Sequence, residues 1–147
     1  FYPTFIEVAG LPIMPELDGV SLMPLLRGAD DWEPVPQFWH FPVYLQAYNG
    51  AKDDARDPLF RTRPGSAIRV GKWKLHEYFE SGSLELYDLS NDPGERSNLV
   101  EHMPAKAEEL SQQLSAWRKQ VGAPVPCQLN SNYDAQLESE AIAQFKK

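Results

Sequence analysis

The chain has 147 residues, of which 42% are apolar and 12% aromatic, so it can bury the core of one domain and is not globally disordered. Its 14 basic and 21 acidic residues give a net charge of -7, which argues against a general nucleic-acid binder, because such proteins need a basic face. No apolar run approaches the ~20 residues that a membrane-spanning helix needs. Cys127 is the single cysteine, so an intrachain disulfide is excluded. Because the sequence begins with Phe1 and not with Met, we expect it to be a fragment whose start lies upstream.

Two helical segments are expected within residues 1–36. The stretch 2–10 favours a helix that ends at Gly10. Ser21 is expected to cap a second, short helix, which Gly28 ends. The apolar side of this second helix holds Leu22, Leu25 and Leu26.

An aromatic-rich strand and a long polar segment are expected next. Residues 37–44 favour a strand because aromatic side chains dominate them, and Pro42 limits it. Residues 45–65 lack a clear pattern and predict a loop. Loops of this length inside a compact domain are usually functional or disordered, which directs attention to this stretch.

A small antiparallel sheet and one long helix are expected in the second half of the chain. Residues 66–69, 72–79 and 84–89 predict three strands, and the short turns between them imply a meander. Residues 104–121 predict a helix with an apolar stripe, ended by Gly122. One helix laid over a small sheet buries both apolar faces, so the predicted fold class is α+β.

Basic and aromatic residues near the long loop are the candidates for binding. Residues 61–74 carry five cations and no acid, which indicates either a local anion site or a solvated surface. His40 lies among aromatic residues, where an imidazole is either a hydrogen-bonded structural group or a ligand contact. His76 and His102 are expected to be ordinary surface residues. The cations of the basic segment are Arg61, Arg63, Arg69, Lys72 and Lys74.

Four motifs in order resemble the sulfatase family. A segment with Tyr87-Asp88-Leu89, Asp92-Pro93, Glu95 and Asn98-Leu99 is similar to a signature near the C-terminus of sulfatases. Three further segments resemble other parts of the same enzymes. They are the N-terminal stretch with Pro3-Thr4-Phe5 and Leu17-Asp18-Gly19, the strand pair with Ser66-Ala67-Ile68-Arg69 and Trp73-Lys74-Leu75, and the tail with Pro126-Cys127-Gln128. The resemblance covers about residues 1–134.

The resemblance implies an enzyme that hydrolyses sulfate esters with a formylglycine nucleophile and a calcium ion. Formylglycine arises in a C/S-x-P-x-R motif, which this sequence does not contain, since Leu129 and Ser131 follow Cys127 where Pro and Arg would be required. The chain is therefore expected to shape the substrate cleft of a parent sulfatase, to contribute no catalytic or metal-binding residue, and to be inactive alone. Calcium is implied for the parent and not for this chain.

The same resemblance suggests a division of the chain and a set of partners. Residues 1–36 are expected to belong to the edge of a missing α/β N-terminal catalytic domain, residues 37–125 to form a C-terminal subdomain, and residues 126–147 to form a tail, weakly helical over 135–145. The substrate is expected to be a sulfated glycan or an aryl sulfate, and a periplasmic or secreted location follows from the family. The orphaned apolar helices predict self-association, with neither nucleic acid nor membrane as a partner.

Substrate contact is expected from residues on or beside the long loop, since the planar fork of arginine suits sulfate oxygens and a tyrosine ring can stack on a sugar. Two alternatives stay open, namely a phosphodiester or phosphonate ester hydrolase of the same superfamily and a noncatalytic binding or assembly module. The expected substrate-binding residues are His40, Tyr44, Arg61, Arg63 and Arg69.

Overall fold

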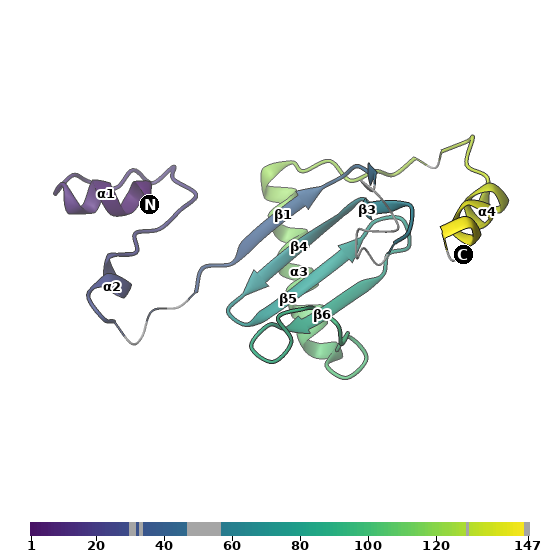
Figure 1. Ribbon diagram of the computed structural model, residues 1–147. Helices are drawn as coiled ribbons and strands as arrows, with labels where there is room; N and C mark the ends of the chain where they lie inside the picture. The colour runs from purple at the N-terminus through teal and green to yellow at the C-terminus, as the bar shows by residue number, and fades with distance from the viewer. Residues whose placement is uncertain (30–31, 33, 47–56, 129, 146–147) are drawn as a thin grey trace. The chain divides into compact units, whose positions relative to one another are not determined.

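The computed structural model describes residues 1–29, 32, 34–46, 57–128 and 130–145 (Figure 1). The chain divides into two compact units, Phe1–Pro36 and Gln37–Lys147. Among the described residues, no helix is both long enough and apolar enough to cross a membrane.

The first unit holds the two expected helices, α1 (Tyr2–Val8) and α2 (Met23–Leu26). A hydrogen bond of 3.0 Å from the Leu22 amide to the Thr4 hydroxyl joins the segment before α2 to α1. The helix cap differs by one position from the prediction. Leu22 occupies the N-cap of α2, while the hydroxyl of Ser21, one residue earlier, accepts a hydrogen bond from the Met23 amide at 3.1 Å.

The second unit is built on a four-stranded antiparallel sheet with the strand order β1-β4-β5-β6 (Figure 1). Its strands are β1 (Gln37–Phe41), β4 (Gly65–Val70), β5 (Trp73–Tyr78) and β6 (Leu84–Asp88). The last three strands form the expected meander, because two tight turns connect them. The aromatic strand β1 joins as an edge strand, with Trp39 opposite Ala67 of β4.

The helix α3 (Pro104–Val121) covers one face of this sheet (Figure 1). Gly122 ends it with a φ of 63°, a left-handed conformation that glycine adopts without steric cost. The α+β prediction of a small antiparallel sheet covered by one long helix is confirmed. The buried core between the two layers consists of Ile68, Leu75, Leu86, Ala107, Leu110 and Leu114.

The loop predicted over residues 45–65 is wrong at both ends. Two short strands, β2 (Leu45–Gln46) and β3 (Phe60–Thr62), pair with each other in a separate antiparallel ribbon. These strands are too short to show an alternating pattern in the sequence, which is why a loop was expected. Residues 47–56, also part of that prediction, lie outside the described residues. The weak helix expected in the tail is present as α4 (Ala135–Phe145).

Because side chains alternate along each strand, the sheet has two chemically different faces. Leu75 packs into the core beneath α3, so its neighbour His76 points to the opposite face, here called the outer face. The strand register places Trp39, Ala67, His76 and Glu85 in one row across this outer face.

Candidate functional site

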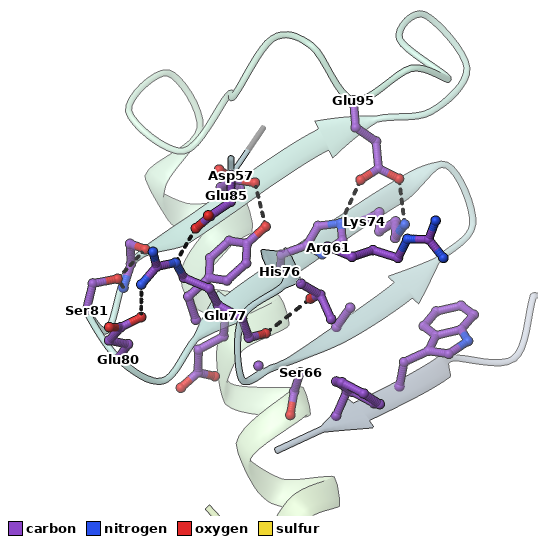
Figure 2. A pocket seen from close by; sticks show the side chains of 18 of the residues that line it. Asp57, Arg61, Ser66, Lys74, His76, Glu77, Glu80, Ser81, Glu85 and Glu95 are labelled. Atoms are coloured by element: carbon purple, nitrogen blue, oxygen red, sulfur yellow. Dashed lines mark hydrogen bonds and ion pairs between the residues drawn. The ribbon is translucent and has the colours of Figure 1, made fainter. Parts of the chain in front are cut away.

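A broad hollow of about 820 Å³ lies on the outer face of the sheet (Figure 2). Gly65 and Ala67 of β4 lie at its floor. At Gly65 a Cβ atom would stand 2.6 Å from the Glu77 carbonyl oxygen, so only glycine fits between these paired strands. Other residues that line the hollow include Trp39, Phe41, Asp57, Arg61, Arg63, Lys74, His76, Tyr78, Glu80 and Glu95.

One edge of the hollow is aromatic. Trp39 and Phe41 of β1 lie on the outer face, and these residues are 49% and 41% exposed. Beside them the small residues Gly65 and Ala67 leave room above the sheet. Exposed aromatic rings next to a polar hollow offer flat apolar surface to a ligand.

Across the hollow, the Glu95 carboxylate holds two side chains of β5 (Figure 2). Its Oε1 accepts a hydrogen bond from Lys74 Nζ at 2.5 Å, and its Oε2 accepts one from His76 Nε2 at 2.7 Å. Since a carboxylate only accepts, His76 Nε2 carries a proton. The backbone of Glu95 is left-handed, with a φ of 53°, and no other non-glycine residue that the structure describes has a positive φ. From this conformation the Glu95 side chain reaches back over β5.

The electrostatics of this trio favour a neutral imidazole beside an ionised carboxylate. Burial lowers the pKa of His76 below 6.5, the charge of Lys74 lowers it further, and Glu95 opposes both only in part. Burial raises the pKa of the Glu95 carboxyl, but the hydrogen bond from Lys74 and the neighbouring His76 outweigh it, so the pKa falls below 4.5. The prediction that His76 is an ordinary surface residue is wrong, because its side chain is only 22% exposed and is hydrogen-bonded.

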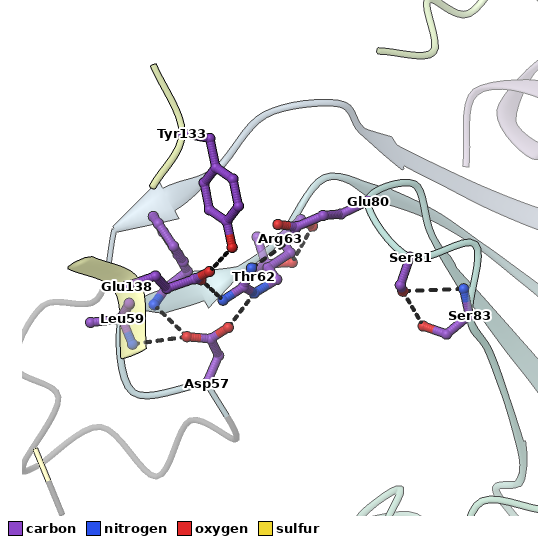
Figure 3. Close-up of polar contacts among 10 residues, drawn as sticks. Asp57, Leu59, Thr62, Arg63, Glu80, Ser81, Ser83, Tyr133 and Glu138 are labelled. Carbon is purple, nitrogen blue, oxygen red and sulfur yellow. Dashed lines mark hydrogen bonds and ion pairs between the residues drawn. The ribbon is translucent and has the colours of Figure 1, made fainter. Parts of the chain in front are cut away.

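At the other end of the hollow, Arg63 lies among three carboxylates (Figure 3). Its Nε donates to Asp57 Oδ2, its Nη1 to Glu80 at 2.7 Å and its Nη2 to Glu138 at 2.7 Å. The guanidinium also lies over the Phe60 ring, 5.2 Å from its centroid. Burial lowers the pKa of Arg63, but the three carboxylates raise it above its ordinary value, so the side chain is charged at every physiological pH.

Of the five expected substrate-binding residues, the hollow brings together Arg61 and Arg63. Tyr44 lies against the Phe60 ring, with centroids 4.8 Å apart. The Nε of Arg69 donates to the Gly71 carbonyl at 3.0 Å. Neither Tyr44 nor Arg69 lines the hollow, although Arg69 stands on the same face as Lys74, its partner in the strand register.

His40 lies on the face of the sheet that α3 covers. Its Nε2 donates to the Pro124 carbonyl oxygen at 2.9 Å, and its Nδ1 shares a hydrogen bond of 2.8 Å with the Ser66 hydroxyl. The imidazole thus ties β1 and β4 to the segment that follows α3. Both ring nitrogens are hydrogen-bonded within the chain, and His40 does not line the hollow.

Sequence reasoning missed the residues that define the rest of the hollow. The alternation in β5 does place Lys74, His76 and Tyr78 on one face, but such a polar face is usually solvated. The sequence did not show that Glu95 would bond to this polar face, because nothing in it predicts that a glutamate adopts a left-handed conformation after a turn. Among the described residues, no group of three or more His, Cys, Asp or Glu side chains could hold a metal ion.

The turn between β6 and α3 is held by its own polar side chains. Asp92 Oδ2 accepts hydrogen bonds from the Arg96 and Ser97 amides at 2.7 and 2.8 Å. Asn98 Oδ1 accepts from the Leu86 amide at 3.0 Å, which fixes the segment to the edge of β6. The Asp-Pro-x-Glu signature is therefore structural, and its glutamate also reaches the hollow.

The fold and the motifs define a C-terminal subdomain of a sulfatase, and the comparison with known families agrees. Residues 1–120 match the family described as N-sulphoglucosamine sulphohydrolase, C-terminal, and the chain belongs to this family.

Several relatives are sulfatases. Arylsulfatase K of Mus musculus is 33% identical over 115 residues, covering 77% of this chain and 19% of the relative. A sulfatase of Formosa agariphila is 34% identical over 142 residues, covering 84% and 23%. The Delta 4,5-hexuronate-2-O-sulfatase of Bacteroides thetaiotaomicron is 33% identical over 101 residues, covering 67% and 18%. The chain thus spans about a fifth of the length of the curated relatives it matches.

Two solved structures show the same fold. BT4656, solved in complex with its substrate D-glucosamine-2-N,6-O-disulfate, matches with a TM-score of 0.56 and 27% identity, covering 82% of this chain and 23% of that one. BT1596, a 2-O GAG sulfatase, matches with a TM-score of 0.57 and 28% identity, covering 84% and 24%. The homologues are sulfuric ester hydrolases, and the matched family is the C-terminal part of such enzymes.

Proposed function

We propose that this chain is the substrate-side C-terminal part of an enzyme that hydrolyses sulfate esters carried by a sugar. The observation that carries the proposal is the family match over residues 1–120. Relatives named for a sulfated hexuronate and for a disulfated glucosamine support the sugar as the substrate class. Residues 1–36 then belong to the edge of the larger catalytic domain of the parent enzyme.

Within this proposal, the outer-face hollow supplies the contact to substrate. Arg61 is exposed and lines the hollow, and its guanidinium can donate two parallel hydrogen bonds to a sulfate. Trp39 and Phe41 offer ring faces on which the apolar side of a sugar can stack. Arg61 is therefore the expected substrate-binding residue to test first.

The bond-breaking chemistry belongs to the rest of the parent enzyme. Among the described residues, no group of three or more His, Cys, Asp or Glu side chains could hold a calcium ion. The sequence carries no C/S-x-P-x-R motif from which a formylglycine nucleophile could form. The 147-residue chain alone is therefore expected to bind but not to turn over a sulfate ester.

A substrate panel tests the proposal on the full-length parent and on this chain side by side. The panel contains D-glucosamine-2-N,6-O-disulfate, a 2-O-sulfated hexuronate, an aryl sulfate and a phosphonate monoester, and released sulfate or phosphonate is quantified. We expect sulfate release by the parent only, fastest with a sulfated sugar. Preference for the phosphonate monoester would favour the alternative hydrolase, and no turnover of any substrate by the parent would favour a noncatalytic module.

A further inference from the structure

The three carboxylates that surround Arg63 come from three separate parts of the chain (Figure 3). Asp57 precedes β3, Glu80 follows β5, and Glu138 lies in α4, 75 residues along the chain from Arg63. We propose that Arg63 is a latch that fastens the C-terminal helix α4 to the wall of the outer-face hollow. This inference goes beyond the proposed function and does not depend on which ester the parent hydrolyses.

The charge balance argues for a latch and against a sulfate receptor at Arg63. Among the described residues, one guanidinium faces three carboxylates, so these four side chains together carry an excess of two negative charges. A sulfate brought to Arg63 would meet this excess at short range and would have to displace partners that are already hydrogen-bonded. The side chains of Arg63 and Glu138 are only 23% and 19% exposed, so solvent screens their attraction weakly.

On the α4 side, Glu138 is held from two directions. Arg63 Nη2 donates to its Oε1 at 2.7 Å, and the Tyr133 hydroxyl donates to its Oε2 at 2.5 Å. The hydrogen bond from Tyr133 and then that from Arg63 lower the pKa of the Glu138 carboxyl below 4.5, so the latch stays charged at neutral pH. The Asp134 carboxylate caps the helix by accepting from the Gln136 and Leu137 amides.

On the other side, the same guanidinium fixes the segment that lines the hollow. Asp57 Oδ1 accepts hydrogen bonds from the Leu59 and Phe60 amides at 2.8 and 3.1 Å, while Asp57 Oδ2 accepts from Arg63. Arg63 therefore closes a tight loop around β3, which carries Arg61. Releasing α4 leaves Asp57 and Glu80 as the remaining partners of the guanidinium.

The helix α4 is a suitable element for such a latch because it is weak alone. It has 11 residues, fewer than an isolated helix usually needs to be stable in water, and Leu137 on it is 63% exposed. Its order must then depend on attachment to the rest of the unit. The family match ends at residue 120, so this attachment lies beyond the part of the chain that the family describes.

Hydrogen exchange of the full 147-residue chain tests the latch. We compare Glu138→Gln with the matched control Glu140→Gln, because the Glu140 carboxylate is on the same helix but bonds only within it, to Gln136 at 3.0 Å among the described contacts. Loss of a charge-assisted hydrogen bond should speed amide exchange over residues 135–145 by about tenfold in Glu138→Gln. The control should change it by less than about twofold, the range of an exposed helix pair.

The second arm uses Arg63→Gln and the double variant Arg63→Gln/Glu138→Gln. If the two groups form one latch, the double variant speeds exchange over 135–145 by less than the two single effects combined. Peptides of β5 report whether Arg63→Gln still folds, and if it does not, the comparison of Glu138→Gln with Glu140→Gln decides alone. Equal exchange in those two helix variants, or additive effects in the double variant, would overturn the proposal.

Discussion

Substitutions of Glu95 test how the outer face of the sheet is stabilised, because the Glu95 backbone conformation lowers the free energy of unfolding while its side-chain hydrogen bonds raise it. Its φ of 53° is a left-handed conformation that costs a residue with a Cβ about 1 kcal/mol relative to glycine. Its carboxylate makes one charged hydrogen bond to Lys74 and one to His76, each worth roughly 1.5–3 kcal/mol when one partner is removed. With the side chain 23% exposed, the lower end of that range applies.

Two substitutions separate these contributions. Glu95→Ala removes both hydrogen bonds and keeps the strained backbone, so the free energy of unfolding should fall by about 3 kcal/mol. Glu95→Gly removes the same bonds but relieves the strain, so the loss should be about 2 kcal/mol. The difference of ~1 kcal/mol corresponds to roughly 4 °C in melting temperature for a domain of this size.

Urea and thermal unfolding, followed by tryptophan fluorescence, measure both variants against the unchanged chain. We expect the unchanged chain to be the most stable, Glu95→Gly to be intermediate and Glu95→Ala to be the least stable. If Glu95→Gly were as stable as the unchanged chain, the two hydrogen bonds would contribute nothing. If Glu95→Ala were the more stable of the two variants, the left-handed backbone would carry no strain.

Three further predictions concern the core, pH and association. Leu110 of α3 is fully buried against the sheet, so Leu110→Ala should lower the free energy of unfolding by ~2–5 kcal/mol in urea titration. Leu137 of α4 is 63% exposed, so Leu137→Ala should change it by under about 0.5 kcal/mol, and similar losses in the two variants would contradict the packing described. Because burial holds the folded-state pKa of His76 below 6.5, the unfolded chain binds more protons there, so the free energy of unfolding should fall as pH drops below 6.5. His76→Gln should flatten that slope in urea titrations across this pH range, and an unchanged slope would contradict the role of His76. Phe5 and Leu26 are 66% and 71% exposed, so the unchanged chain should self-associate, and light scattering at micromolar concentration should show an oligomer. The double variant Phe5→Ser/Leu26→Ser should dissociate this oligomer, and a monomeric unchanged chain would refute self-association.

The sequence predicted the elements with strong periodicity. We could predict α3 from its apolar stripe, and β4, β5 and β6 from the short turns between them, because burial imposes a regular spacing on apolar residues. The ribbon of β2 and β3 could not be predicted from the sequence, because strands of two and three residues are too short to show such a spacing.

The candidate site was only partly predictable, because its geometry depends on contacts between distant residues. The basic segment predicted Arg61 as a candidate, and Arg61 lines the hollow. The sequence could not show that Arg63, two residues later, meets Glu138 from the tail, since such pairing follows from tertiary structure alone. The same holds for His76, whose partner Glu95 arrives from a turn 19 residues away.

The measurement closest to the central claim is kcat/KM of the full-length parent for D-glucosamine-2-N,6-O-disulfate, compared between Arg61→Gln and the matched control Arg96→Gln. Both arginines are exposed, but only Arg61 lines the hollow among the residues that the structure describes there. Loss of a charged hydrogen bond to the sulfate predicts a fall of roughly 10- to 100-fold in kcat/KM for Arg61→Gln, mainly through KM, and less than about twofold for Arg96→Gln. Equal kcat/KM values in the two variants would contradict the assignment of the outer-face hollow to the substrate.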